Sequence, residues 1–291
     1  MSNISLIVPE RAADIGNFMV GRLLPFRQKR SVGPFVFIDH MGPAKMGAGK
    51  SLDVLPHPHI GLSTLTFLFE GAIMHRDTIG SEIEIRPGEV NWMTAGKGVV
   101  HSERTPDYLR LAEKTLHGLQ IWVALPLELE ETEPSFAHID ALDIPCWESD
   151  GLTIKLIAGE ALGRKSPVPV HSPLYFIEIK SMKTQTVRLG DELYGESGLY
   201  ILEGVVRSEG HSFEAKQLLV AKDIKMCSFE IEAGSSVYLF GGEPFPEERY
   251  IDWNWVSSRK ERLLQAREDW INGRFPLPEG ESEFVPYPGR G

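Results

Sequence analysis

The chain has 291 residues, of which 42% are hydrophobic and 24% are charged, and this ordinary composition of a soluble globular protein excludes a disordered or fibrous chain. Its 30 basic and 41 acidic residues give a formal net charge of −11, which disfavours binding to nucleic acid or to an anionic membrane surface. The 28 glycines and 20 prolines exceed the average share and favour many short strands joined by turns.

The cysteines and the start of the chain bear on its compartment. Cys146 and Cys227 are far apart and neither has a second thiol nearby, so we expect neither a disulfide framework nor a thiolate metal site. The first ten residues lack a basic cluster followed by an apolar core, and the longest stretch without Asp, Glu, Lys or Arg, residues 54–69, contains prolines and histidines. We therefore expect no signal peptide, no membrane span and a cytoplasmic location.

Side-chain character alternates with a period of two through the interior of the chain, which is typical of β-strands. The alternation is clear over residues 64–69 and 119–124. Turn-forming residues interrupt the strands at 70–71, 86–89, 95–98 and 203–204. This rhythm predicts an all-β fold of antiparallel sandwiches or barrels rather than βαβ units.

Two segments of the first half recur in the second half. Residues 67–71 match residues 200–204, and residues 119–122 match residues 237–240. Each half is therefore predicted to contain one copy of a similar β unit. The smaller offset of the second match indicates shorter loops in the second copy.

The connection between the two copies is predicted from composition. Residues 134–150 are rich in acidic and turn-forming residues, so we place the boundary near residue 145. This divides the chain into an N-terminal domain of residues 1–144 and a C-terminal domain of residues 145–291. The predicted architecture is two antiparallel, jelly-roll-like β-barrels in tandem.

One amphipathic helix is predicted near the end of the chain. Ser258 followed by Glu261 has the spacing of a capping box, and Asn272 with Gly273 is a stop signal. Large and apolar side chains recur between them at helical spacing, namely Leu263, Ala266, Arg267 and Trp270. We expect this helix to pack on the outside of the β structure.

Two pairs of side chains have the pattern of metal ligands. His57 and His59 lie at the start of a predicted strand, where residues i and i+2 project from the same face, and His101 and Glu103 repeat this spacing. Enough chain separates the pairs for two hairpin strands, so closing a small barrel can bring all four side chains together. A lone His-x-His pair is most often two unrelated strand residues, but a second pair of ligand type favours a metal site.

The donor set narrows the choice of metal. Three imidazoles and one carboxylate, without sulfur, suit iron, manganese, nickel, cobalt or copper better than a structural zinc. Four protein ligands on an octahedral ion would leave two positions for a substrate oxygen and for dioxygen.

Longer motifs surround these residues in a characteristic order. They are Phe37-Ile38-Asp39-His40, His57-Pro58-His59-Ile60-Gly61, His75-Arg76-Asp77, Arg86-Pro87-Gly88, Trp92-Met93-Thr94-Ala95-Gly96, His101-Ser102-Glu103 and Ile157-Ala158-Gly159-Glu160. Their order and spacing closely resemble the pirin family of the cupin superfamily, and the resemblance covers nearly the whole chain.

The resemblance implies a bicupin fold with one mononuclear site in the N-terminal domain. The residues that match the family's ligands are His57, His59, His101 and Glu103, and the metal is usually iron, here expected as Fe2+ with manganese, nickel, cobalt or copper as alternatives. Several bacterial and mammalian members open flavonols such as quercetin with dioxygen. Other members are linked to transcriptional regulation through protein partners.

The leading hypothesis is therefore a quercetin 2,3-dioxygenase-type oxidoreductase, in which Glu103 either stays on the metal or accepts the proton of the flavonol 3-hydroxyl. The alternative is a metal-bearing, redox-sensing module that is recognised by a regulatory protein, for which the acidic balance suits a basic partner. A third possibility is an isomerase of a sugar or a small acid, because related barrels use the same ligand types.

The second half lacks a matching ligand set. At the repeat offset, His57 and His59 correspond to Gly190 and Glu192, and residues 219–231 contain no His-x-Glu pair. We therefore expect one metal ion per chain, a second barrel that contributes packing, and a monomer.

The candidate pocket residues each have an alternative structural role. His40 is either pocket lining or a structural hydrogen-bonding group, and Gln120 either points toward the metal or lies on the outer face. Trp92, Met93 and Trp122 supply a pocket wall or simply a core. The other histidines are expected to have structural or surface roles, with a surface hydrogen bond for His75: His75, His117, His138, His171 and His211.

Overall fold

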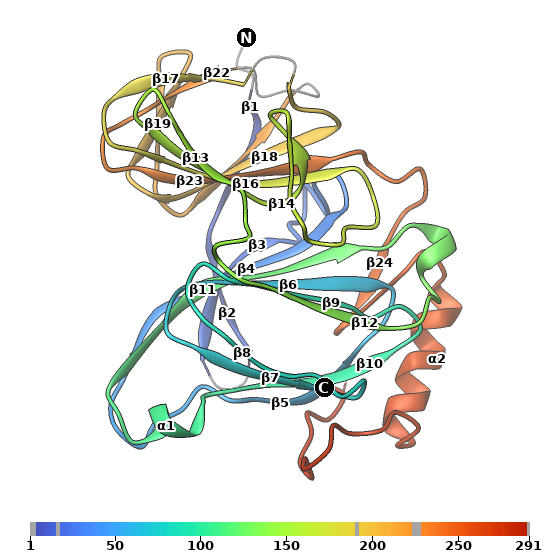
Figure 1. Cartoon of the computed structure of the whole chain (residues 1–291). Helices are drawn as coiled ribbons and strands as arrows, with labels where there is room; N and C mark the ends of the chain where they lie inside the picture. The colour runs from blue at the N-terminus through green and yellow to red at the C-terminus, as the bar shows by residue number, and fades with distance from the viewer. Residues whose placement is uncertain (1–3, 16–17, 190–191, 223–227, 290–291) are drawn as a thin grey trace. The chain divides into compact units, whose positions relative to one another are not determined.

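The structure is a computed structural model that describes residues 4–15, 18–189, 192–222 and 228–289 (Figure 1). Its residues group into two compact units. Unit 1 comprises Met1–Arg11, Arg22–Ile38 and Leu142–Phe245, and unit 2 comprises Ala12–Gly21, Asp39–Ala141 and Pro246–Gly291. Both units are built from antiparallel strands, which confirms the predicted all-β architecture.

Most of the elements along the chain are short strands. Up to residue 141 they are β1 (Ile4–Pro9), β2 (Arg11–Asp14), β3 (Met19–Leu24), β4 (Phe35–Met46), β5 (Val54–His59), β6 (Leu62–Glu70), β7 (Ile73–Asp77), β8 (Glu82–Ile85), β9 (Val90–Thr94), β10 (Val99–Arg104), α1 (Asp107–Arg110), β11 (Lys114–Ala124), the 3-10 turn η1 (Leu127–Leu129) and β12 (Ser135–Ile139). Beyond residue 141 they are β13 (Cys146–Ser149), β14 (Leu152–Ala161), β15 (Arg164–Lys165), β16 (Leu174–Ser181), β17 (Gln185–Arg188), β18 (Glu196–Glu203), β19 (Val205–Ser208), β20 (His211–Glu214), β21 (Gln217–Ala221), β22 (Ser228–Ile231), β23 (Ser236–Gly242), β24 (Tyr250–Asp252), β25 (Trp255–Ser257) and α2 (Lys260–Ile271).

Unit 2 contains two facing sheets. One runs in the order β12-β9-β6-β11-β4-β3-β2, with the end of β3 and the start of β4 grouped with unit 1, and the other runs in the order β5-β10-β7-β8. Figure 1 shows β5, β10, β7 and β8 as a layer opposite β6, β9 and β12. Leu68 on β6 packs with Ile73 and Ile85 of the smaller sheet in one buried cluster. The side of β6 that carries Leu68 is therefore the inner face of this sandwich.

The register across β9, β6 and β11 decides which side chains share this inner face. Directly paired residues point to the same side of a sheet, and residues two apart on a strand do so as well. The inner-facing set is Thr64, Thr66, Leu68, Asn91, Met93, Gln120 and Trp122. Polar side chains are thus interspersed with apolar ones at the centre of unit 2.

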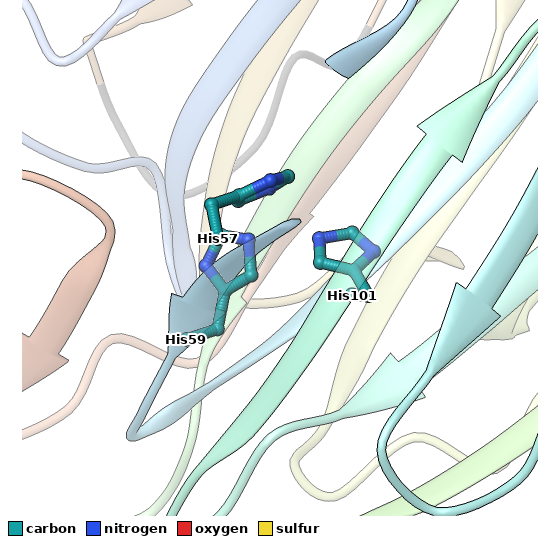
Figure 2. A group of neighbouring side chains, drawn as sticks. All are labelled: His57, His59 and His101. Atoms are coloured by element: carbon teal, nitrogen blue, oxygen red, sulfur yellow. The ribbon is translucent and has the colours of Figure 1, made fainter. Parts of the chain in front are cut away.

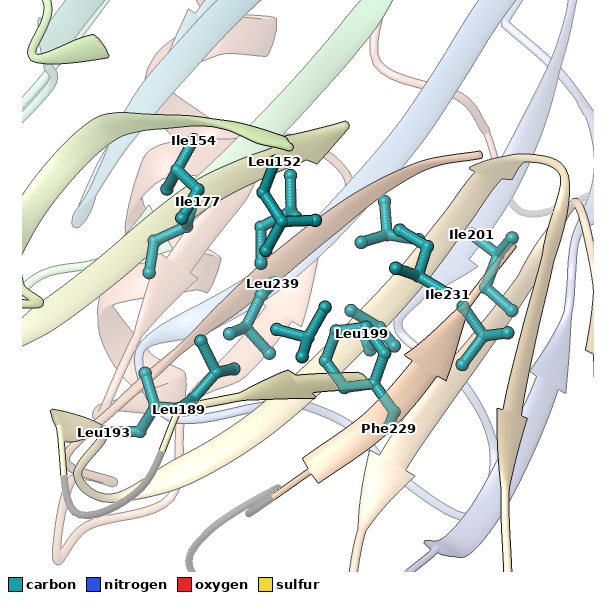
Figure 3. Packing of buried hydrophobic residues seen from close by; sticks show 14 of the residues in the cluster. Leu152, Ile154, Ile177, Leu189, Leu193, Leu199, Ile201, Phe229, Ile231 and Leu239 are labelled. Atoms are coloured by element: carbon teal, nitrogen blue, oxygen red, sulfur yellow. The ribbon is translucent and has the colours of Figure 1, made fainter. Parts of the chain in front are cut away.

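Unit 1 contains the second pair of sheets. Their orders are β1-β21-β18-β23-β16-β14-β13, with β15 beside β14, and β17-β22-β19-β20. A buried cluster of Leu, Ile, Val and Phe side chains fills the space between them (Figure 3). Leu199 on β18 and Leu239 on β23 are paired across this inner face.

The internal repeat appears as two equivalent strand pairs. β6 pairs with β11 in unit 2, and β18 pairs with β23 in unit 1. Gly71 and Gly204 follow the first strand of each pair with φ of 90° and 80°, a left-handed conformation that glycine adopts without strain. The register from the sequence match is wrong by one residue on the second strand, because the partner of Thr66 is Gln120 whereas the partner of Leu199 is Leu239 rather than Tyr238. A slip of one residue places a side chain on the opposite face.

The predicted helix is present as α2, but its start differs from the prediction. The N-cap is Arg259, and no side chain caps the first turn. The hydroxyl of Ser258 instead donates to Oε2 of Glu130, 3.1 Å away, so the capping box does not form. At the other end Asn272 is the C-cap and Gly273 has φ of 65°, as the stop signal predicts.

Helix α2 and the residues after it group with unit 2. Leu263 and Trp270 of the helix and Trp255 of β25 pack against Ile60 and Val100 of the smaller sheet. Each compact unit therefore consists of several separate segments of the chain. The predicted domain boundary between residues 144 and 145 stays a prediction.

Other predictions concern cysteines, membrane spans and the second barrel. Cys146 is an exposed free thiol, and Cys227 and Gly190 lie outside the described residues. None of the helices in the described ranges is long and apolar enough to span a membrane. Within the part of unit 1 that the structure describes, no three metal-ligating side chains come together.

Candidate metal centre

Three histidines from two neighbouring strands converge inside unit 2 (Figure 2). His57 and His59 come from β5, and His101 comes from β10, where it lies directly opposite His57. Each offers a ring nitrogen, and these nitrogens lie within 4.8 Å of one another. All three side chains are buried. The spacing of two residues on β5 and the antiparallel register of β10 together produce this arrangement, which can hold one cation.

Hydrogen bonds orient two of the rings. Nδ1 of His57 donates to the carbonyl oxygen of Leu55 at 2.8 Å, and Nδ1 of His59 donates to the carbonyl oxygen of Asn254 at 2.9 Å. A carbonyl oxygen only accepts, so each Nδ1 carries the proton and each Nε2 keeps its lone pair. Such a bond on the far nitrogen is the usual support of a metal-binding imidazole.

The third ring supplies the test of whether a metal fits. Nε2 of His101 is buried and has no hydrogen-bond partner among the described residues. Leaving a buried polar atom without a partner costs about 1–3 kcal/mol. A cation bound between the three rings removes this cost, so the donor set fits a metal ion.

Burial also sets the protonation of the three rings. It lowers the pKa of His57 from 6.5 to about 4, and it lowers the pKa values of His59 and His101 well below the usual value. Mutual repulsion among the histidines lowers them further. At neutral pH the imidazoles are therefore neutral, which is the form that binds metal.

Glu103 lies on the same face of β10 as His101 but outside the group of three histidines. Its Oε1 is 3.4 Å from the hydroxyl of Thr66, which also donates to Oε1 of Gln120 at 2.9 Å. Burial raises the pKa of Glu103. The structure places this carboxylate beside Thr66, and its roles as fourth ligand and as proton acceptor stay proposals.

His75 is buried on β7, so the surface position expected for it is wrong. Its Nε2 is 2.9 Å from Oδ2 of Asp77, and its Nδ1 is 3.4 Å from Nδ1 of His101. The ring stacks on Phe136 at 4.6 Å between centroids. The polar sequence around His75 indicates a turn, but the inner face of this sheet is itself polar. The period-two spacing of Ile73, His75 and Asp77 was the signal that could have identified it.

Two opposing effects act on the pKa of Asp77. Burial alone raises its pKa, but hydrogen bonds from His75 and from the backbone amide of Ser81 outweigh burial, so the pKa is lowered. The carboxylate therefore stays charged and fixes the His75 ring beside His101. His75 and Asp77 form a buried pair that sequence reasoning missed.

The four predicted pocket residues divide between the two faces of the larger sheet. Gln120 and Met93 belong to the inner-facing set, whereas Trp92 alternates with Met93 and points to the opposite face. His40 follows the same alternation, because its neighbour Met41 packs in the inner cluster while its own ring contacts Phe69 outside it.

One further aromatic ring and two further histidines have contacts that bear on their predicted roles. Trp122 lies with its ring 5.2 Å from that of His59, so it borders the histidine group directly. His117 is 2.8 Å from His40 between their Nε2 atoms. His138 bonds to Asn91 at 2.7 Å and lies in a second group with Glu89 and Asp140, whose carboxyl is exposed.

Two family profiles match this chain. The profile of the pirin family matches residues 17–123, and that of the pirin C-terminal cupin domain matches residues 177–276. A pirin-like protein of Caulobacter vibrioides is 49% identical over 98% of this chain and 99% of its own length.

Two solved structures of quercetin 2,3-dioxygenase from Acinetobacter baumannii are also similar. One is 38% identical with a TM-score of 0.89 over 98% of this chain and 95% of its own. The other is 26% identical with a TM-score of 0.86 over 95% of this chain and 99% of its own. With two cupin-like units, a buried group of three histidines and relatives that match along its length, this chain belongs to the pirin family of the cupin superfamily.

Proposed function

We propose that this chain is a metal-dependent dioxygenase that opens flavonols of the quercetin type. The observation that carries the proposal is the convergence of three buried, neutral histidines, of which His101 has an unpartnered Nε2 among the described residues. The similarity to two quercetin 2,3-dioxygenases from Acinetobacter baumannii supports the choice of reaction.

In this proposal His57, His59 and His101 hold one divalent transition metal, with Fe2+ favoured by the family resemblance. Nitrogen and oxygen donors without sulfur also accept manganese, nickel, cobalt or copper. When bound, the ion supplies Lewis-acid polarisation of a substrate oxygen and electron exchange with dioxygen.

Glu103 is proposed as the group that accepts the proton of the flavonol 3-hydroxyl. Burial raises its pKa, and a base is most effective when its pKa lies closer to the operating pH. The contact with Thr66 stabilises the carboxylate form and holds it on the inner face. Its position next to the histidine group but outside it suits a proton acceptor, and ligation of the metal is the alternative role.

Side chains of the larger sheet would orient the flavonol. Gln120 uses its carbonyl oxygen for Thr66, so its amide nitrogen is the donor that it can offer to a substrate hydroxyl. Trp122 and Met93 supply an apolar wall that excludes water and packs on aromatic rings. Dioxygen then adds across the central ring, and carbon monoxide leaves with formation of a depside ester, which balances the atoms.

Turnover of quercetin by metal-loaded protein tests the proposal. Protein loaded separately with iron, manganese, nickel, cobalt or copper is mixed with quercetin with and without oxygen. We expect loss of the flavonol absorbance band and one carbon monoxide per quercetin, only in oxygen. Turnover without oxygen, or no turnover with any of the five metals, contradicts the proposal.

A second proposal is a redox-sensing module for a regulatory protein partner. The net charge of −11 favours a basic partner through electrostatic complementarity. Recovery of a partner is compared for apo, ferrous and ferric protein. Equal recovery in the three states contradicts this role.

A further inference from the structure

The C-terminal part of the chain, residues 250–287, covers the outer face of the sheet that carries the histidines. Ile60 follows His59 and Val100 precedes His101, so both side chains point away from the metal group. Both pack instead in the aromatic and aliphatic cluster that includes Trp255. The metal ligands and the C-terminal segment therefore lie on opposite faces of the same two strands.

This segment reaches through to β5 by backbone contacts. The carbonyl of Asn254 accepts the Nδ1 proton of His59, as described above. Two residues later the amide of Val256 donates to the carbonyl of Ile60 at 3.1 Å. Gly61 permits this approach, because a Cβ there would lie 2.0 Å from the carbonyl oxygen of Val256, and its φ is 66°. The strand β25 thus fixes the end of β5 next to His59.

The end of the segment makes a second contact with β5. The amide of Val285 donates to the carbonyl of Pro56, 2.9 Å away and next to His57. The indole of Trp270 on α2 in turn donates to the carbonyl of Val285 at 3.0 Å. Tyr287 stacks on Trp255 with a centroid distance of 5.6 Å and nearly parallel rings. These contacts hold the residues around Glu281 against the sheet.

Glu281 makes the corresponding contacts with β10. The hydroxyl of Ser102, which lies between His101 and Glu103 in sequence, donates to Oε1 of Glu281 at 2.8 Å. Nε of Arg104 donates to the same oxygen at 2.7 Å, and its Nη2 pairs with Oε2. The side chains of Glu281 and Arg104 are 8% and 15% exposed, so this two-pronged ion pair is largely screened from water.

We propose that Glu281 is a positioning residue for the metal centre. By holding Ser102 and Arg104 from the outer side, it fixes the twist of the strand that presents His101 and Glu103 to the inner side. It acts through β10 and touches neither metal nor substrate, although it lies 179 positions from Ser102 along the chain. The inference rests on the proposed metal site but does not depend on which reaction that site performs.

The test compares Co2+ binding by the full-length protein and two charge-matched variants. Glu281→Gln keeps the shape of the side chain and removes the charge that pairs with Arg104. Glu279→Gln makes the same charge change at an exposed position of the same segment and serves as the control. Affinity is measured by competition with a chelator, and the environment of the ion by the visible absorption bands of bound Co2+.

We expect Glu281→Gln to lower the affinity for Co2+ by about tenfold or more, a loss typical of outer contacts that orient metal ligands, and to shift the absorption bands. Glu279→Gln keeps the affinity and the spectrum of the unchanged protein. Wild-type affinity and spectrum in Glu281→Gln overturn the proposal.

Three further outcomes are informative. Where Glu281→Gln does not fold, Ser102→Ala replaces it, with a smaller loss of affinity and the same direction of band shift expected, and unchanged binding overturns the proposal. Failure of the unchanged protein to bind Co2+ overturns both the positioning role and the proposed metal site. Binding of Co2+ without any quercetin turnover overturns only the proposed reaction.

Discussion

The interiors of the two units differ although the strands that build them are equivalent. In unit 2 the inner pair across β6 and β11 is Thr66 with Gln120, whereas in unit 1 the inner pair across β18 and β23 is Leu199 with Leu239. The interior of unit 1 is filled by aliphatic and aromatic side chains, whereas the interior of unit 2 contains three histidines and a glutamate. The same sandwich thus accommodates either a packed core or a polar site, and side chains of one face decide which.

The largest expected effect concerns the ligands themselves. His101→Ala removes one of three converging nitrogens, so we expect metal affinity to fall by more than about a hundredfold, beyond the losses seen for outer contacts. His211→Ala, at an exposed position in unit 1, is the matched control and keeps one ion per chain. Metal content by elemental analysis after dialysis measures both. Full metal occupancy in His101→Ala would show that the histidine group is not the site.

The matching prediction for unit 1 concerns its apolar core. Leu199→Ala leaves a cavity in a fully buried cluster, and we expect unfolding to become easier by about 2–5 kcal/mol. We expect metal stoichiometry to stay at one ion per chain, because the candidate ligands lie in unit 2. The midpoint of urea unfolding and the metal content measure the two effects separately. Loss of metal at unchanged stability would contradict the division of roles between the units.

The pH dependence of stability should distinguish the polar interior from the apolar one. The pKa of His57 is about 4 in the folded protein and 6.5 when it is exposed, so the unfolded chain binds more protons between these values. The metal-free protein therefore loses stability as pH falls below 6.5, by about 2 kcal/mol at pH 5 from His57 alone. Urea midpoints at pH 7 and pH 5 measure the loss. His57→Gln should lose less, and an equal loss in that variant would refute the assignment.

The smallest change in stability is expected for a double substitution that makes the inner pair of unit 2 resemble that of unit 1. Thr66→Val with Gln120→Leu replaces both partners of one hydrogen bond by apolar groups, which alone is close to neutral for stability. The change also removes the long contact between Thr66 and Glu103, so we expect a loss of about 1 kcal/mol. Quercetin turnover should nevertheless fall, since Glu103 loses the hydroxyl beside it. Unfolding midpoints and turnover are compared in one preparation. Unchanged turnover would show that this pair plays no part in the reaction.

The sequence predicts much of the fold and the core of the candidate site because both depend on local periodicity. The spacing of His57 and His59 places both rings on one face, and the repeat around Glu70 and Glu203 identifies the two β units. These features need only the alternation of side chains along a strand.

The remaining features depend on contacts between distant segments. The burial of His75 depends on His101 of the neighbouring strand and on Phe136 of the sheet opposite, and Ser258 bonds to Glu130 rather than to its own helix. The support of His59 by Asn254 and of β10 by Glu281 joins residues about two thirds of the chain apart. No periodic pattern in a single sequence encodes such pairings. The one-residue slip at Leu239 shows that even a clear repeat does not determine which face of the sheet a residue of the second strand lies on.

The discontinuity of unit 2 has a consequence for biosynthesis. The chain leaves the ribosome from its N-terminus, so the strands with His57, His59 and His101 emerge early, and residues 142–245 of unit 1 follow them. Pro246–Gly291, which supplies Asn254, Trp255 and Glu281 behind those strands, emerges after both. The unit with the candidate metal site therefore begins to form before residues 142–245 are translated, and the contacts behind its histidines form only after those residues have emerged.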